Sequence, residues 1–366
     1  MKRVSKRSLF VFFAIFGLIV SSFAMIQTAQ AASGDYSIKP EASADEVNID
    51  NGTYVIEGDP GQQVQVKIGV INKSNKTRKF VINANTAYTN NSGQPGYDKT
   101  KVHDPSLKIQ TRDAITPNNI IATVKGGKEM IIPVTLTIPK KSFKGYIMGG
   151  FNVKPYKEKA KGTVSANGTL IKNKFSYSLP IQIHQKSSAN QDPKYSINTV
   201  KPGLVSDAAH QRAGVNANVH NSANGFVTEL SSKATVTKKD DKSFKITKSQ
   251  TGQAIAPTSN YDYSISWGKK PMKAGNYHLK LVYKTNNGIK SWTLNKDFTI
   301  TNAQAAKYNK LAGIKPNYMW LYILLGILLL AIILGLGIYL GRRNKNNNGN
   351  NNNGNTPNKP TRRRRR

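Results

Sequence analysis

The sequence predicts an all-β chain with two tandem antiparallel β-sandwich domains of immunoglobulin-like type and one C-terminal transmembrane α-helix. Between Ser33 and Thr301, apolar residues recur at every second position and helical periodicity is nearly absent. Turn sequences such as DNG, GDPGQ, NNSGQPG and TNNG separate these short runs. Near the C-terminus, Met319 to Leu340 form one uncharged apolar stretch, which gives the single helix.

The first 31 residues have the features of a secretory signal peptide. Four basic residues within the first seven positions precede a long apolar run. Ala29-Gln30-Ala31 then fits the small-x-small pattern of a cleavage site. We therefore expect residues 1–31 to be removed and the chain to be exported as far as Lys315. The alternative is an uncleaved anchor that would tether the chain at both ends.

Three segments show the strand alternation most clearly, and each places its apolar residues on one face. They are VQVKIGV, MIIPVTLTI and YHLKLVY. The expected core-facing residues are Val64, Val66, Ile68 and Val70 in the first, Met130, Ile132, Val134, Leu136 and Ile138 in the second, and Tyr277, Leu279, Leu281 and Tyr283 in the third.

A polar segment, YKEKAKGTVSANG at 156–168, interrupts this alternation and suggests a domain boundary. We accordingly expect a first sandwich over 33–155 and a second over 163–301. The polar stretch 302–317 is expected to form a short stalk before the apolar helix.

The apolar segment 318–341 is long enough to cross a membrane. Within it, the 22 residues from Met319 to Leu340 span about 33 Å as a helix, against about 30 Å of bilayer hydrocarbon. Tyr318, Trp320 and Tyr322 lie at one end and Tyr339 at the other, where aromatic rings favour the membrane interface. A soluble core helix would show a polar face, and this segment has none.

The basic tail 342–366 is expected to be cytoplasmic and disordered. Arg342, Arg343 and Lys345 directly follow the helix, as the positive-inside rule requires. The five terminal arginines are expected to fix topology and contact anionic lipid, and they are Arg362, Arg363, Arg364, Arg365 and Arg366. Because the tail has no aromatic residue, we expect no nucleic-acid partner. No LPxTG-like pentapeptide precedes the helix, which argues against covalent wall anchoring.

Composition limits the chemistry and the partners that we expect for the exported part. The chain has no cysteine, so neither disulfides nor thiolate chemistry are available to it. Thirteen of its 54 basic residues lie at the two ends while all 19 acidic residues lie between them, which leaves a formal charge of +22 on the middle. Such a surface attracts polyanions, which at a bacterial surface are teichoic acids and acidic polysaccharides. A lysine-rich surface without a specific partner is the alternative.

Two series of motifs resemble the domains of WxL-interacting proteins. EGDPGQ, VKIGVINKSN, ANTAYTNNSGQPGY and IPKKSFKGYIMGGFNVKP resemble the peptidoglycan-binding domain of that family. VKPGLV, IAPTSNYDYSISW, AGNYHLKLVY and SWTLNKDFTI, between residues 200 and 300, resemble its host-binding domain. The resemblance implies a surface protein of Gram-positive bacteria that assembles with WxL proteins. One departure is Thr258, where the family often has asparagine after the Ala-Pro pair.

The sequence offers no constellation for catalysis, a metal or a cofactor, and we expect none. The five histidines are widely spaced, although two of them could still meet in the fold; they are His103, His184, His210, His220 and His278. Asp45, Glu46 and Asp50 could hold calcium, but a solvated turn fits their spacing better. Asp240-Asp241 reads as a charged hairpin turn. No nucleophile elbow or phosphate-binding loop is present, so an enzyme is not expected.

The most suggestive binding surface is the loop NANTAYTNNSGQPGYDK. Tyrosine faces can stack on sugar rings, and amides can bond to hydroxyl and acetamido groups. The candidate ligand-binding residues are Tyr88, Asn90, Asn91, Gln94 and Tyr97. The alternative is a structural turn whose tyrosines anchor it to the sheet. In the second domain Tyr261, Tyr263 and Trp267 are also candidates, but core packing explains at least two of them better.

These observations favour a single-pass surface scaffold or adhesion protein with its N-terminal region outside the cell. Its expected partners are WxL-domain proteins, peptidoglycan or other wall polyanions, and host matrix or plant ligands. The alternative is a sensory ectodomain with a membrane anchor. The polar, arginine-ended tail offers no folded output domain, which argues against that alternative.

Overall fold

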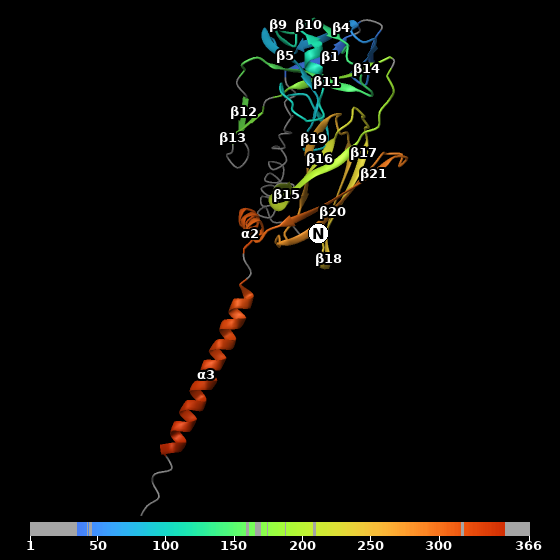
Figure 1. Ribbon diagram of the computed structural model, residues 1–366. Helices are drawn as coiled ribbons and strands as arrows, with labels where there is room; N and C mark the ends of the chain where they lie inside the picture. Colours follow the sequence, from blue (N-terminus) through green and yellow to red (C-terminus); the bar gives the residue numbers. More distant parts are fainter. Residues whose placement is uncertain are drawn as a thin grey trace, which may run out of the picture. The chain divides into compact units, whose positions relative to one another are not determined.

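The computed structural model describes residues 35–41, 43, 46–158, 161–164, 170–173, 175–186, 188–207, 210–315 and 318–347. The chain divides into two compact units, Met1–Tyr308 and Asn309–Arg366. The first unit contains two β-sandwiches, and the second contains the long C-terminal helix (Figure 1). The signal peptide expected over 1–31 and the five terminal arginines lie outside the described residues.

The first sandwich consists of a four-stranded and a six-stranded sheet. The four-stranded sheet has the order β1 (Tyr36–Glu41), β4 (Gln63–Asn72), β10 (Glu129–Thr137), β8 (Ile115–Thr116). The six-stranded sheet has the order β2 (Val47–Asp50), β3 (Thr53–Gly58), β14 (Tyr177–Gln185), β11 (Ile147–Pro155), β5 (Arg78–Thr86), β9 (Asn119–Val124). A short 3-10 turn, η1 (Thr111–Ala114), precedes β8.

The core of the first sandwich lies between these sheets and confirms the expected alternation. Val64, Val66, Ile68 and Val70 of β4 are all buried. In β10 the alternation holds from Ile132 onwards, whereas Met130 at the start of the strand is 39% exposed. Aromatic rings fill the centre, and the ring of Tyr54 meets that of Phe151 edge to face at 5.9 Å.

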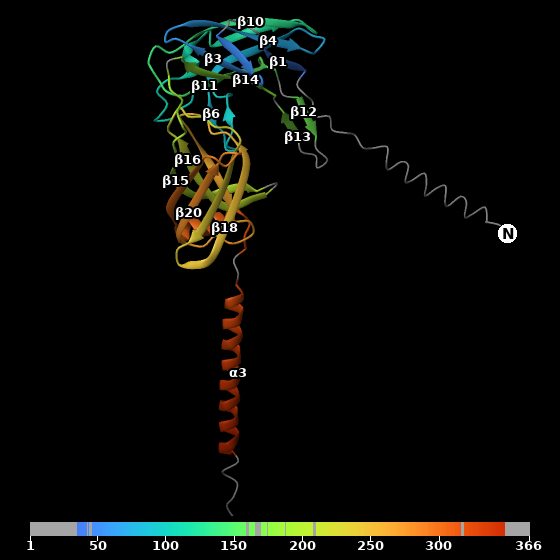
Figure 2. The ribbon, with the colours of Figure 1, turned by 90° about the vertical axis from the view of Figure 1, so that its right-hand side faces the viewer.

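Sheet pairing differs from the expected boundary between the domains. Strand β14, which the sequence pattern assigns to the second domain, pairs antiparallel with β11 and parallel with β3 in the first sandwich. The polar segment after β11 contains part of a separate hairpin, β12 (Lys161–Val164) and β13 (Leu170–Asn173). Figure 2 shows this hairpin beside the sandwich. The polar segment is therefore an excursion before the last strand of the first sandwich.

The second sandwich packs a three-stranded sheet on a four-stranded one. The first has the order β15 (Tyr195–Asp207), β16 (His210–Asn221), β19 (Ser259–Ser266). The second has the order β18 (Asp241–Gln253), β17 (Leu230–Lys238), β20 (Gly275–Lys284), β21 (Ser291–Ile300). As expected, Asp240 and Asp241 lie at the β17–β18 hairpin, where Lys238 pairs with Asp240 at 3.0 Å.

Buried tyrosines dominate the core of the second sandwich. The four apolar residues expected to face inward from YHLKLVY, Tyr277 to Tyr283, are fully buried in β20. The hydroxyls of Tyr261 and Tyr283 lie 2.7 Å apart, and that of Tyr263 lies 3.2 Å from Ser232 Oγ. These polar atoms are thus satisfied across the two sheets, as buried groups require. Tyr261, Tyr263 and Trp267 are core residues.

Two helices follow the second sandwich. Helix α2 (Asn302–Leu311) begins at a capping box, in which Thr301 and Gln304 exchange hydrogen bonds of 2.9 and 3.2 Å. The expected stalk is thus helical over most of its length. Helix α3 (Met319–Asn347) is long and apolar enough over Met319–Arg342 to cross a membrane. Its apolar side chains are exposed, and the positions of Arg343 and Lys345 fall within its last turns.

Candidate functional site

The two sandwiches of the first unit meet along a junction that includes the loop predicted to bind ligand. This loop forms a small hairpin, β6 (Tyr88–Thr89) and β7 (Pro95–Gly96). Its tip is bonded to the second sandwich, because the Ala254 N–H donates to the Gly93 carbonyl at 2.8 Å. The Thr89 hydroxyl also accepts from the Ala256 N–H at 3.0 Å. The loop is therefore a structural part of the junction.

Two of the five candidate side chains are used within this hairpin. The Asn90 Oδ1 accepts from the N–H groups of Ser92 and Gln94, at 2.9 and 3.2 Å. The Gln94 side chain donates to the Gly252 carbonyl of the second sandwich. The Asn90 oxygen and the Gln94 nitrogen therefore hold the loop in place and are not available to a ligand.

The remaining three candidates differ in their exposure. The ring of Tyr97 packs on β11, where a Cβ on Gly150 would lie 2.8 Å from it. Tyr88 is half-buried, donates to Asp98 Oδ1 at 2.7 Å, and has the Lys99 ammonium 3.8 Å from its ring centroid. Burial, and then this hydrogen bond, raise the pKa of Tyr88 to about 12. Asn91 is exposed.

Tyr88 and Asn91 border a hollow of about 250 Å³ between the sandwiches, which we call the tyrosine hollow. Its polar lining from the first sandwich is Tyr88, Thr89, Asn91, Lys99, Lys101, His103 and Asp104, and that from the second is Asn218, Ser259, Asn260 and Asp262. The structure thus brings two of the predicted residues together with lysines and carboxylates from sequence segments far apart.

Asp104 is the central polar contact at this hollow. Its side chain is 1% exposed and accepts hydrogen bonds from Asn260 at 2.6 Å and from the Ser106 hydroxyl at 2.5 Å. The His220 Nε2 lies 2.9 Å from Asp104 Oδ1. Burial alone would raise the pKa of Asp104, but the bonds from Ser106 and Asn260 outweigh burial and lower it. Asp104 therefore connects the two sandwiches as a buried carboxylate.

Thr258 occupies a strained position at the same junction. Its φ is 45°, in the left-handed region that β-branched residues rarely adopt. Its N–H donates to the Ala223 carbonyl at 3.2 Å, which helps to hold this backbone conformation. Asparagine tolerates this region well, which gives a physical reason for the asparagine that the resembling family often has here.

Replacing Thr258 by asparagine is expected to stabilise the protein by about 0.5–1 kcal/mol, because the left-handed backbone is less costly for asparagine. Thermal unfolding of the full chain should show a midpoint about 2–3 °C higher. Thr258→Ser, which removes the β-branch methyl and keeps the hydroxyl, separates backbone strain from packing. A lower midpoint for Thr258→Asn would show that the buried threonine methyl matters more than the strain.

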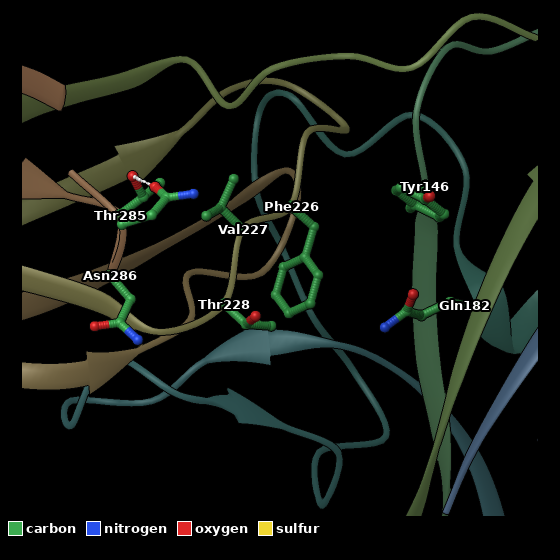
Figure 3. A pocket seen from close by; sticks show the side chains of 8 residues that line it. Tyr146, Gln182, Phe226, Val227, Thr228, Thr285 and Asn286 are labelled. Atoms are coloured by element: carbon green, nitrogen blue, oxygen red, sulfur yellow. Dashed lines mark hydrogen bonds between the residues drawn. The ribbon is translucent and has the colours of Figure 1, made fainter. Parts of the chain in front are cut away.

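A second hollow, of about 560 Å³, lies elsewhere on the junction, and we call it the aromatic hollow. The first sandwich contributes Tyr146, before β11, and Gln182 of β14. The second contributes the loop residues Phe226 to Thr228 and the β20–β21 turn residues Thr285 to Asn287. Figure 3 shows the Phe226 ring between the Tyr146–Gln182 pair and the Thr285–Asn286 turn.

Sequence reasoning missed the aromatic hollow. Its residues come from four separate segments, and none of those segments has an unusual composition by itself. A weak signal exists, because both aromatic residues directly follow a glycine, as Gly145-Tyr146 and Gly225-Phe226. The same dipeptide at Gly150-Phe151 belongs to the core, so the pattern alone does not select a site.

The histidines and acids do not gather into a metal site in the part of the chain that the structure describes. There, no group of three or more histidine, aspartate or glutamate side chains could hold a metal ion. His220 faces Asp104, and His278 faces Asp297 at 2.6 Å on the outside of β20. Asp45 lies outside the described residues.

Comparisons with family models match most of the chain that precedes helix α3. Residues 36–155 match the model described as WxL Interacting Protein, peptidoglycan binding domain. Residues 166–310 match the model described as WxL Interacting Protein, host binding domain. The second match includes β14, which pairs within the first sandwich. Both models describe binding domains, and their order agrees with the order expected from the motifs.

Comparisons with solved structures find distant similarities. The Pseudomonas aeruginosa CupB2 chaperone is 11% identical, with 67% of this chain and 96% of that chain covered and a TM-score of 0.26. The E. coli chaperone DraB is 13% identical, with 69% and 97% covered and a TM-score of 0.26. A PapD-like domain of human CEP192 is 12% identical, with 42% and 91% covered and a TM-score of 0.23. Comparison with curated proteins finds no match.

Proposed function

This chain belongs to the WxL-interacting protein family, and from that premise we propose that it is a membrane-anchored scaffold or adhesion protein of the cell surface. The observation that carries the proposal is the order of its parts. A peptidoglycan-binding domain and a host-binding domain precede one helix that could span a membrane. In a chain of this order, the helix would tether two binding modules to the membrane.

In this proposal the sandwiches are extracellular and the C-terminal tail is cytoplasmic. The basic residues Arg342, Arg343 and Lys345 directly follow the apolar part of α3, which supports this orientation by the positive-inside rule. An exported middle with a formal charge of +22 would also be drawn to the polyanions of a bacterial wall.

WxL-domain proteins and peptidoglycan are the partners that we propose, together with host or plant extracellular ligands. For the predicted loop, we assign ligand contact to Tyr88 and Asn91, which border the tyrosine hollow. Asn90, Gln94 and Tyr97 would support these contacts by holding the loop, since their side chains are bonded or packed within the junction.

The test is retention of the purified full chain, in detergent micelles, on peptidoglycan and separately on a WxL protein from the same cell. We expect retention on both at low salt that persists at about 0.5 M salt, because a shaped interface is screened less than an exposed charge pair. Retention that disappears with salt would show that the +22 surface binds without specificity. Absence of retention on either ligand would reject the scaffold function.

A further inference from the structure

We propose that the aromatic hollow binds an uncharged sugar that carries an N-acetyl group, as in a chain of N-acetylhexosamine units. The inference rests on the proposed function, because it assigns a glycan ligand to a specific place on a glycan-binding surface protein. In this proposal the two sandwiches form the binding site together, since each contributes residues to the lining.

The chemistry of the lining differs from that of the rest of the exported chain. None of the eight residues that line the hollow is charged, although the exported part has a formal charge of +22. The lining instead combines two aromatic rings, Tyr146 and Phe226, with three side-chain amides, Gln182, Asn286 and Asn287. Aromatic faces with a few directed polar groups are the usual composition of a small-molecule site.

Two of these amides are available to a ligand. Within the described residues, no hydrogen bond engages the side chains of Gln182 and Asn286, and both are at least partly exposed. Asn287 uses its Oδ1 to accept from the Thr285 hydroxyl at 2.7 Å and keeps its amide nitrogen available. Asn90 and Gln94 of the predicted loop, by contrast, are engaged within the junction. The aromatic hollow therefore presents two side-chain amides and the nitrogen of a third to a ligand.

The two rings are fixed before any ligand arrives. The Tyr146 N–H donates to the Asn224 carbonyl at 2.9 Å, and its ring lies 5.3 Å from that of His184. The backbone next to Phe226 is held by buried Asn221, which donates to the Gly225 carbonyl at 2.9 Å. The Phe226 ring also packs against the small cluster of Ala87, Met148 and Ala256. A site that is already ordered loses less entropy on binding.

An N-acetylated sugar matches this arrangement in size and in chemistry. The volume of about 560 Å³ lies within the range of ligand pockets. The C–H face of a sugar ring and the methyl of the acetyl group are apolar, as are the faces of Tyr146 and Phe226. The acetamido N–H and carbonyl match the acceptor and donor of a side-chain amide such as Gln182. With no cation in the lining, an acidic sugar gains nothing from this site.

The test is calorimetric titration of the full chain, in detergent micelles, with a tetramer of N-acetylglucosamine. We expect Gln182→Ala and Asn286→Ala each to weaken binding by about 3- to 10-fold, the usual effect of losing one neutral hydrogen bond. Phe226→Ala should weaken it by more than about 10-fold. Cellotetraose has hydroxyls in place of the acetamido groups, and its affinity should be about 10-fold lower than that of the tetramer.

Matched controls keep the result interpretable. Gln65→Ala on β4 and Phe175→Ala remove an exposed amide and an exposed ring that do not line the hollow, and both variants should bind as the wild type does. Because the Gln182 and Asn286 side chains make no hydrogen bond in the described chain, their variants should also unfold at the wild-type temperature. Phe226→Ala alone could lose binding through loosened packing, so the two amide variants decide the result.

A parallel retention assay on peptidoglycan separates the sources of the sugar and the two proposals. Loss of both tetramer binding and peptidoglycan retention in the amide variants supports a wall glycan in the hollow. Loss of tetramer binding with retention kept supports an external N-acetylated glycan there. The inference would be overturned if the wild type did not bind the tetramer, or if the amide variants bound it as the wild type does. Either result would count even if peptidoglycan were retained. A wild type that retains no peptidoglycan would contradict the proposed function itself.

Discussion

Replacement of Gly225 by alanine is expected to lower the thermal unfolding midpoint of the full chain by about 5–10 °C. A Cβ at this position would lie 2.2 Å from both the carbonyl carbon of Asp192 and the backbone nitrogen of Pro193. Neither atom belongs to a flexible side chain, so the backbone itself must move. Overpacking of this kind costs about 3 kcal/mol or more.

The damage should concentrate at the junction, because Gly225 holds two loops against each other. Its carbonyl accepts from Asn221, whose Oδ1 in turn accepts from the Lys194 N–H at 3.1 Å. Displacing the segment around Asp192 would therefore disturb the entry to β15 as well as the backbone of Phe226. We accordingly expect the Gly225→Ala variant to bind the N-acetylglucosamine tetramer more weakly even below its unfolding temperature.

Gly203→Ala is the matched control for this variant. A Cβ on Gly203, in the middle of β15, would meet only the flexible Asn216 side chain, at 3.1 Å. Its backbone is not in the left-handed region, so alanine should change the midpoint by less than about 3 °C. An equal and small effect of both substitutions, measured by circular dichroism, would show that the loops at Gly225 are not in close contact.

The strands could be predicted from the sequence because a strand with one buried face has apolar residues at every second position of its own sequence. The alternation of Val64 to Val70 and of Tyr277 to Tyr283 identifies the inward face without knowledge of any partner. This alternation does not show which other strand pairs with a given strand. Strand β14 pairs with β3, more than a hundred residues earlier, and the intervening polar hairpin looks like a linker.

The candidate site shows the same limit more strongly. The composition of the loop around Tyr88 suggests a glycan contact, but whether an amide is free depends on atoms from the other sandwich. Gln94 is engaged by the Gly252 carbonyl, and the sequence of the loop contains no trace of that contact. Gln182 lies in an ordinary alternating strand, and only the fold places it opposite Phe226.

The second large effect is expected for Asp104→Ala, which should destabilise the junction by about 2–4 kcal/mol. The substitution removes the buried carboxylate that the His220 ring and the Asn260 amide share as a hydrogen-bond partner. Ser106 also loses the acceptor for its N–H at 2.9 Å. A midpoint lower by about 5–10 °C should be seen by calorimetry. Asp50→Ala, at the exposed end of β2, is the matched control and should have little effect.

The same carboxylate predicts how stability depends on pH. The pKa of Asp104 is lowered in the folded chain, so folding favours its ionised form. Its contribution is therefore complete above the unfolded pKa of about 4 and is lost as the pH falls through the lower folded value. Other carboxylates contribute in the same direction, since the pKa of Asp240 and that of Asp297 are lowered too.

Comparison with Asp104→Asn isolates this contribution. The amide keeps the shape of the side chain but carries no negative charge and does not titrate. At neutral pH the variant should therefore have a lower free energy of unfolding than the wild type. The difference in unfolding free energy between wild type and variant should be constant above about pH 5 and should shrink below about pH 4. A difference that stays constant down to about pH 2 would show that the ionised carboxylate is not what holds the two sandwiches together at this point.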